Sequence, residues 1–194
     1  MVIYSTKDID LIVSALKQGK TVAFGTDTVF GLACIVDNKE ALDKIYKIKN
    51  RDINKKLPMM FSSIDMMDEY VNINIEARKL INHFIKGPIT YILNNKDNSD
   101  TIACRIPDDL WIIELINKVG KPLYVTSANI SNEAPLYKYE DVINILKDVD
   151  VVVKKNADGK LSSTIVDGTN SFKILREGPI SKDEIDKVLH ENSL

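Results

Sequence analysis

The chain has 194 residues, of which 44% are hydrophobic and 28% charged, and its formal net charge is −2. This length and composition are those of a globular protein with one substantial core, and the small net charge excludes a general attraction to nucleic acids or anionic membranes. No apolar run approaches the roughly 18 residues of a membrane span, and the N-terminal segment lacks the layout of a signal peptide, so we expect a cytoplasmic protein without a membrane partner.

The predicted elements begin with a strand at 2–4 and a helix at 8–19, where "STKD" favours a helix start and Gly19 a helix end. A strand at 21–24, the turn "GTDT" and an amphipathic helix at 38–49 follow. Next come a strand at 57–62 and helices at 64–71 and 75–85. The rest of the chain adds strands at 90–93, 101–106, 123–126, 151–154, 163–167 and 172–176, with helices near 110–119, 140–148 and 181–191.

Strands and helices alternate without a linker or repeat, which predicts a single α/β domain over residues 1–194. Because some successive strands lack a helix between them, the sheet should be mixed. Cys34 and Cys104 each lie in an apolar segment and are expected to be buried, reduced thiols. The sequence has no CxxC motif or Cys/His cluster, so we expect no metal bound by protein side chains.

Ligands of open α/β sheets bind in loops at strand ends, so the polar loops are the candidates for a site. In "FGTDTVFGL" (24–32), glycines bracket Thr26, Asp27 and Thr28, whose hydroxyls and amides can hold a small polar ligand or simply form a turn. "LYVTSANIS" (123–131) ends a strand on Ser and Asn side chains. "GKLSSTIVDGTNSFKILREG" (159–178) reads as a hairpin that ends near Arg176.

The stretch "KIKNRDINKKLP" (47–58) contains five basic residues and one acid, Asp52. It could be a helix end that opposes the helix dipole, a patch for a nucleic-acid backbone, or the wall of a pocket for a small polyanion. The chain has 26 basic residues but only four arginines, and Arg51, Arg105 and Arg176 lie at strand ends or in polar loops. Their placement indicates that these positions need the planar guanidinium group, which can donate two parallel hydrogen bonds to one anion.

The sequence offers no Ser/His/Asp arrangement, carboxylate pair or P-loop motif. Its polar loops supply cations, hydroxyls and amides but no nucleophile with an adjacent base. Such residues suit chemistry by positioning and charge neutralisation, as in phosphoryl or nucleotidyl transfer. The residues themselves therefore predict a pocket for an anionic ligand in an α/β domain.

Taken in order, these loops resemble the motifs of the YrdC-like family, the threonylcarbamoyl-AMP synthases. "GTDTVFGL" is similar to the family's P-T-D-T-V-Y-G-L, and Lys49, Arg51 and Lys55 match its K-x-R with a later Lys. "GPITYIL" resembles G-P-x-T-x-I-L, "TIACRIP" resembles T-x-x-x-R-x-P, and "TSANIS" contains the S-A-N segment. "SSTIVD" and "ILREG" resemble the closing S-T-x-x-D and L-R-x-G motifs.

The resemblance implies a twisted mixed sheet flanked by helices with a basic concave cavity. It implies that L-threonine, bicarbonate or CO2, and ATP give threonylcarbamoyl-AMP, pyrophosphate and water. The product would feed a downstream threonylcarbamoyl transferase complex that modifies tRNA, and tRNA itself is a possible partner. Mg2+ would accompany the ATP phosphates. A YciO-like relative with another small substrate and an RNA-binding module are the alternatives.

The resemblance also implies residue roles. The central polar tetrad would be Lys49, Arg51, Ser127 and Asn129. The residues that contact ATP would be Arg51, Lys55, Thr101, Ser127, Pro135 and Arg176. Threonine would be held by Thr28, Arg105, Ser163 and the backbone of Val125, with Arg105 pairing with its carboxylate in bidentate fashion. The attacking group would be the carboxylate of N-carboxythreonine, so the substrate brings its own nucleophile.

Several positions depart from the family pattern. Gly25 replaces a proline, which is expected to loosen the turn before Thr26, and Phe30 lacks the hydroxyl of the usual tyrosine. Met60 stands where some members have a histidine that contacts threonine. Within the basic stretch, Lys49, Arg51 and Lys55 are expected to face the phosphates, and Lys47 and Lys56 to face solvent.

Overall fold

The computed structural model describes residues 1–84, 86–159, 161–170 and 172–190. Its strands form one mixed sheet in the order β1-β8-β2-β3-β7-β4-β6-β5-β9-β10. The strands are β1 (Val2–Ser5), β2 (Val22–Gly25), β3 (Phe30–Ile35), β4 (Met59–Met60), β5 (Ile89–Asn94), β6 (Thr101–Arg105), β7 (Leu123–Ser127), β8 (Val151–Lys154), β9 (Thr164–Asp167) and β10 (Lys173–Arg176). The helices are η1 (Thr6–Asp8), α1 (Ile9–Lys17), α2 (Lys39–Lys49), α3 (Ile64–Asp68), α4 (Ile75–His83), α5 (Leu110–Val119), α6 (Tyr139–Ile145) and α7 (Lys182–His190).

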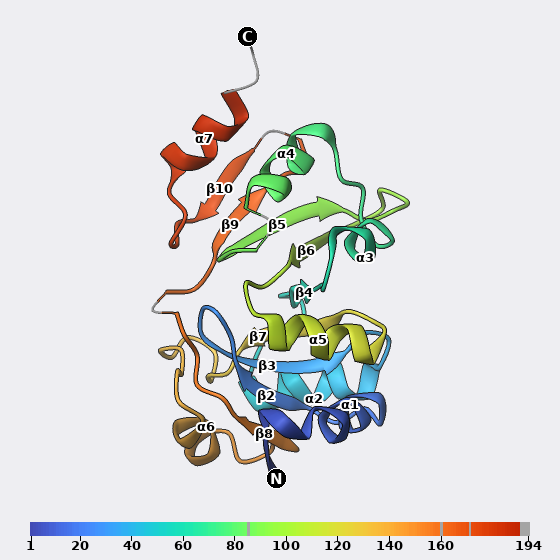
Figure 1. The fold of residues 1–194 in the computed structure, drawn as a ribbon, viewed down its shortest axis with the longest axis vertical. Helices are drawn as coiled ribbons and strands as arrows, with labels where there is room; N and C mark the ends of the chain where they lie inside the picture. The colour runs from blue at the N-terminus through green and yellow to red at the C-terminus, as the bar shows by residue number, and fades with distance from the viewer. Residues whose placement is uncertain (85, 160, 171, 191–194) are drawn as a thin grey trace.

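The sheet is mixed, as predicted. β4 runs parallel to β6 on one side and antiparallel to β7 on the other, through Met59 and Met60. This two-residue strand joins two halves of the molecule, which lie one above the other in Figure 1. The lower half in that view contains β1, β2, β3, β7 and β8 with α1, α2, α5 and α6, and the upper half contains β5, β6, β9 and β10 with α3, α4 and α7.

Each half has its own apolar core. In the lower half, Ile12 and Leu16 of α1 pack with Leu115 of α5 against one face of the sheet, while Ile45 of α2 packs with Phe30 on the other face. The upper core gathers residues of α4, α7, β5 and β9, which include Leu80, Ile89, Val166, Ile185 and Val188. Helices therefore pack on the sheet in both halves, and the upper and lower cores meet at β4, where Met66 packs against both.

Local sequence signals explain several boundaries. Ser5 and Asp8 form a capping box, as the "STKD" pattern predicts. Asn38 caps the start of α2 by accepting a hydrogen bond from the N–H of Ala41 (2.9 Å). The helix ends at Lys49, and the C-cap residue Asn50 has a left-handed φ of 48°, so the chain turns sharply into the basic loop. Among the described residues, no helix combines the length and apolarity that crossing a membrane requires.

The main element that the sequence analysis missed is β3. Residues 30–35 form a buried strand between β2 and β7, but the segment reads as an apolar run without alternation because both of its faces are covered. The strand expected at 57–62 is only Met59–Met60. The helix expected at 75–85 ends at His83, and the ends of two predicted helices, residues 85 and 191, lie outside the described residues. Cys34 and Cys104 are buried and free, as expected.

The turn that contains Gly25 is held firmly, so the expectation that glycine loosens it is wrong. The N–H of Gly25 donates to the carbonyl of Lys155 (3.0 Å), and Lys155 Nζ donates back to the carbonyl of Gly25 (3.1 Å). A Cβ at Gly25 would lie 2.2 Å from the backbone of Asn156. Proline could neither donate this hydrogen bond nor fit this contact, which explains the glycine in this chain.

We therefore predict that Gly25→Ala lowers the free energy of unfolding by about 1–3 kcal/mol, because the new methyl group overlaps backbone atoms that cannot rotate away. For a chain of this size each kcal/mol lowers the melting temperature by about 2–4 °C. The control is Gly87→Ala, whose Cβ would meet its nearest atom at an ordinary 3.5 Å. Thermal or urea unfolding of both variants gives the test, and equal stability of the two would contradict the close packing at Gly25.

Candidate active site

Two adjoining cavities open near the seam between the halves. The first has a volume of about 330 Å3 and is lined by residues of both halves, among them Thr28, Met60, Arg105, Ser163 and Arg176. The second has a volume of about 270 Å3 and is lined by Lys49, Asn50, Arg51, Asp52, Lys55, Ser127, Asn129, Ser131 and Asn132. Arg51 and Ser127 line both cavities. A ligand that fills both would therefore pass these two side chains.

Lys49 is the last residue of α2 and is only 2% exposed. Its ammonium donates to the carbonyls of Ser127 and Asn129 (2.7 Å for Asn129) and to Asn129 Oδ1 (3.2 Å). Ser127 Oγ donates to the same Oδ1 at 2.5 Å. Three members of the predicted tetrad are thus brought into direct contact. Burial, and then the charge of Arg51, lower the pKa of Lys49 to about 8.

Arg51 closes the basic loop on itself. Its Nε donates to the carbonyl of Lys55 (2.9 Å) and its Nη2 to the carbonyl of Lys56 (3.2 Å). Lys55 lines the second cavity, as expected of a residue that faces phosphates. Lys56 was expected to face solvent, but although its side chain is 59% exposed it also lines the first cavity and forms an ion pair with Asp100.

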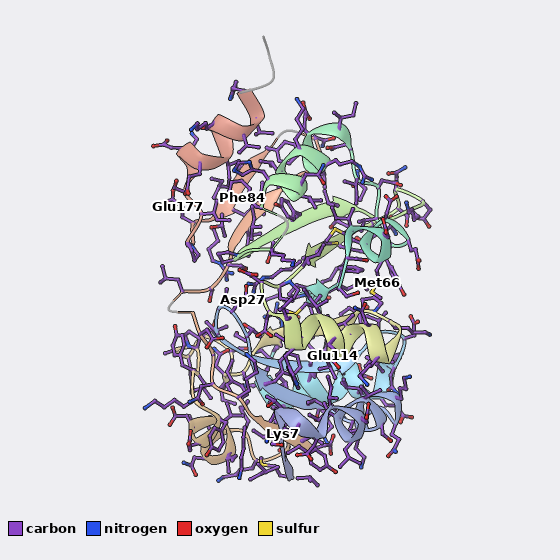
Figure 2. All side chains as sticks on the ribbon, viewed as in Figure 1. Lys7, Asp27, Met66, Phe84, Glu114 and Glu177 are labelled. Carbon is purple, nitrogen blue, oxygen red and sulfur yellow. The ribbon has the colours of Figure 1, made fainter. Side chains whose placement is uncertain are left out.

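Arg105 is buried at the end of β6 and reaches across the seam. Its Nη1 donates to Thr28 Oγ1 (2.8 Å), its Nη2 to Asp27 Oδ2 (2.6 Å) and its Nε to the carbonyl of Gly87 (3.4 Å). The backbone N–H of Asp108 donates to the same Asp27 oxygen at 3.2 Å. Burial raises the pKa of Asp27, and the charge of Arg105 opposes that rise. Figure 2 shows Asp27 at the level where the halves meet.

Arg176 and Ser163 also line the first cavity. Arg176 donates to the carbonyl of Ser163 from Nε (3.0 Å) and Nη2 (2.7 Å), and the hydroxyls of Ser163 and Thr90 lie 2.8 Å apart. Val125 also lines this cavity, but its N–H already donates to the carbonyl of Pro58 (3.0 Å). A ligand contact through its backbone would therefore use the carbonyl.

Two predicted residues lie outside both linings. Thr101 is in β6, and its N–H donates to Asp100 Oδ1 (2.8 Å), the carboxylate that holds Lys56. Pro135 is half-buried in the loop between β7 and α6. Neither residue is among those that line the two cavities, so their predicted contacts with ATP stay predictions.

Sequence reasoning assigned no role to Asp27 or Ser131. Ser131 lines the second cavity, and its buried hydroxyl has no hydrogen-bond partner among the described residues. Both lie within stretches that the sequence singled out, "GTDT" and "TSANIS". The available signal was position within a motif, but nothing local showed that Asp27 would meet Arg105.

The cations of the site differ in how they are compensated. Arg105 and Lys56 are each paired with a carboxylate. In the described part of the chain, Lys49, Arg51 and Arg176 form no such ion pair and contact carbonyl, amide or hydroxyl oxygens instead. Neutral oxygens carry partial charge only, so the second cavity and the part of the first cavity near Arg176 keep a net attraction for anions.

Comparisons with known proteins agree with this geometry. Among curated proteins, the chain is 35% identical over 187 residues to the putative threonylcarbamoyl-AMP synthase of Methanocaldococcus jannaschii, covering 91% of this chain and 89% of that protein. It is 33% identical over 174 residues to the threonylcarbamoyl-AMP synthase of Buchnera aphidicola subsp. Acyrthosiphon pisum, covering 83% of this chain and 98% of that protein.

Solved structures share the fold. The P. abyssi Sua5 structure complexed with L-threonine matches with a TM-score of 0.91 at 25% identity, covering 98% of this chain and 62% of that one. The chain thus spans less than two thirds of that protein. E. coli YciO matches with a TM-score of 0.84 at 20% identity, which indicates the common fold alone.

The family model Sua5_yciO_yrdC, described as telomere recombination, matches residues 14–178. That match includes the basic loop, both cavities and every predicted site residue. It agrees with the motif resemblance and with the mixed sheet flanked by helices. The chain belongs to the Sua5/YciO/YrdC family.

Proposed function

We propose that this chain is a threonylcarbamoyl-AMP synthase, a nucleotidyltransferase that converts L-threonine, bicarbonate or CO2, and ATP to threonylcarbamoyl-AMP and pyrophosphate. The observation that carries the proposal is the pair of cavities that share Arg51 and Ser127. Arg105 of the first cavity is paired with a carboxylate, which suits an amino acid. Arg51 and Arg176 of the same cavity, and Lys49 of the second, contact only neutral oxygens among the described residues, which suits phosphates. The names of the relatives support the same reaction.

Threonine would bind at Arg105. The contacts with Thr28, Asp27 and Gly87 use one N–H of each guanidinium nitrogen, so Nη1 and Nη2 each carry a second N–H that these three hydrogen bonds do not use. Those two donors permit the predicted bidentate contact. The hydroxyl of Ser163 and the side chain of Met60 also line this cavity, and Met60 can contribute apolar contact but not the hydrogen bond of a histidine.

ATP would place its phosphates between Lys49, Arg51, Lys55 and Arg176. The carboxylate of N-carboxythreonine attacks the α-phosphorus, a new P–O bond forms, and the bond to the bridging oxygen breaks as pyrophosphate leaves with its electron pair. Negative charge grows on the leaving group, and fixed cations in a partly water-excluded site stabilise it. The reacting carboxylate belongs to the substrate, so the chain's own residues bind, orient and neutralise.

Mg2+ would arrive bound to the phosphates of ATP and shield their charge. The described part of the chain holds no group of three or more His, Cys, Asp or Glu residues that could bind a metal ion. Asp52 lines the second cavity and is the carboxylate placed to approach such an ion, directly or through water. This donor set suits a metal that enters with its nucleotide.

The geometry favours a small polyanion over an RNA backbone at the basic stretch. Lys49 is buried, and Arg51, Lys55 and Lys56 line cavities instead of forming an open strip. Delivery of the product to a downstream transferase complex, direct contact with tRNA and a cytoplasmic location belong to the proposal as well. The alternative, a YciO-like relative that acts on another small substrate, is distinguished from the proposed synthase by the reaction assay.

The direct test of this function is incorporation of labelled bicarbonate. Purified protein with ATP, Mg2+ and L-threonine should form a labelled threonine adduct of AMP and release pyrophosphate in equal amount. Omission of threonine should abolish both products, because threonine carries the attacking group. Absence of labelled adduct with all substrates present would refute the proposed function.

Arg51→Ala should lower kcat/KM for ATP by at least about 10- to 100-fold, because it removes a charge-assisted phosphate contact and the bonds that close the basic loop. Lys47→Ala is the matched control on the exposed surface of α2, and its activity should stay within about twofold of wild type. Steady-state kinetics with both variants gives the comparison. Equal losses in the two would mean that Arg51 has no special place at the phosphates.

The lowered pKa of Lys49 predicts a pH dependence. The ammonium is charged below pH about 8 and loses its proton as the pH rises past that value, so kcat/KM for ATP should fall on the alkaline side of about pH 8. Bound phosphate favours the charged form, so the corresponding fall in kcat should appear at higher pH.

The informative variant is Lys49→Arg, because arginine keeps its charge throughout the accessible pH range. It should lack the alkaline fall in kcat/KM, whatever its absolute activity. Thermal unfolding checks that the variant is folded. If kcat/KM of Lys49→Arg still falls at the same pH as in wild type, the titrating group is not Lys49.

A further inference from the structure

The buried ion pair of Arg105 and Asp27 is a feature that amino-acid binding does not by itself require. Arg105 is 7% exposed, the Asp27 side chain is 11% exposed, and their charged atoms lie 2.6 Å apart. The second oxygen of Asp27, Oδ1, is buried and has no hydrogen-bond partner among the described residues. A buried ion pair roughly breaks even in stability against an apolar pair of similar volume. A gain in folding stability therefore does not explain why the chain has a carboxylate at position 27.

Its position relative to the other cations suggests a different reason. Arg51 and Arg176 line the same cavity as Arg105, and each contacts backbone carbonyls, with Arg176 also reaching the Ser163 hydroxyl. These neutral contacts leave the cationic charge largely uncancelled. Only Arg105, among these three described arginines, faces a full negative charge. Two kinds of guanidinium therefore line one cavity of about 330 Å3.

The proposed substrates differ in charge in a corresponding way. ATP is a polyanion and bicarbonate a monoanion, whereas an α-amino acid is a zwitterion with no net charge. If every arginine of the cavity kept its charge, phosphate could occupy the amino-acid end as readily as the nucleotide end. A simple anion at Arg105 would lie a few ångströms from Asp27, and this repulsion weakens its binding by roughly 10- to 100-fold in the effective dielectric of a protein. The carboxylate of an amino acid meets the same repulsion, but the ammonium group of the same molecule is attracted by Asp27 and offsets it.

We propose that Asp27 is a specificity-determining residue that excludes phosphate and other simple anions from Arg105 and reserves this end of the cavity for a zwitterionic amino acid. The amino acid rests on the proposed function, but the exclusion of anions depends on the ion pair alone. Asp27 acts through Arg105, without itself lining the cavity. Its carboxylate orients the guanidinium and sets the net charge that an incoming ligand meets.

The probe is inorganic phosphate, measured by calorimetry at low ionic strength. Asp27→Asn keeps the size of the side chain and removes its charge, and it should gain a phosphate site at least about tenfold tighter than any that wild type shows at this place. Asp108→Asn makes the same charge change on a neighbouring exposed side chain and should stay within about twofold of wild type. The double variant Asp27→Asn, Arg105→Met should lose the gained site, and Asp27→Glu should not acquire it.

A competition experiment with L-threonine separates this proposal from the proposed function. In wild type, phosphate should leave bound threonine in place at concentrations that displace a non-hydrolysable ATP analogue, whereas in Asp27→Asn it should displace threonine as well. If phosphate displaces threonine from wild type at the same concentrations at which it displaces the ATP analogue, the proposed exclusion of phosphate is refuted. This result needs no folded variant. Equal phosphate binding by wild type and Asp27→Asn would also overturn the exclusion. Failure of wild type to bind threonine would refute the proposed function and leave the phosphate comparison to decide the role of Asp27.

Discussion

The buried ammonium of Lys49 ties the C-terminal end of α2 to the turn that follows β7. An ammonium taken out of water is costly unless other oxygens replace the solvent, and here Ser127 and Asn129 supply them. The contact can form only when α2, β7 and the chain between them are correctly placed. The N–H of Ser131, which donates to the carbonyl of Lys49 (2.8 Å), strengthens the same connection. The cation that suits a phosphate is therefore also a contact that builds its cavity.

The site also depends on the seam at β4, where the two halves of the molecule meet. Each half of the molecule packs its own core, and the two-residue β4 completes the sheet between them. Arg105 of β6 crosses this seam to Asp27 and Thr28, and Lys56 crosses it to Asp100. Neither half contains the first cavity by itself. Side chains of the predicted site thus hold together the halves whose junction they line, in the way expected of ligand sites placed between packed units.

The distribution of charge fits a reaction in which the protein positions the substrates and neutralises their charge. Arginine and lysine side chains that form no ion pair with a described residue line the two cavities beside Ser127, and Arg105, which is paired with Asp27, also lines the first cavity. The two proposed substrates, which differ in charge, can then bind to different side chains without a dedicated protein nucleophile. The carboxylate of Asp27 is as much a part of this division as the cations, because cancelling one positive charge makes the remaining ones selective.

The sequence by itself determined the α/β class and most of the strands and helices, because hydrophobic period and turn residues are local signals. The resemblance of its motifs to those of a known family gave the family and the predicted site residues. Sequence reasoning missed β3, since a strand covered on both faces shows no alternation, and it misjudged Gly25, whose tight packing comes from residues 155–156. Only the tertiary structure decided which cations keep their charge. Arg105 and Asp27 are 78 positions apart, as are Lys49 and Ser127, and burial of such pairs depends on chain segments that no local pattern brings together.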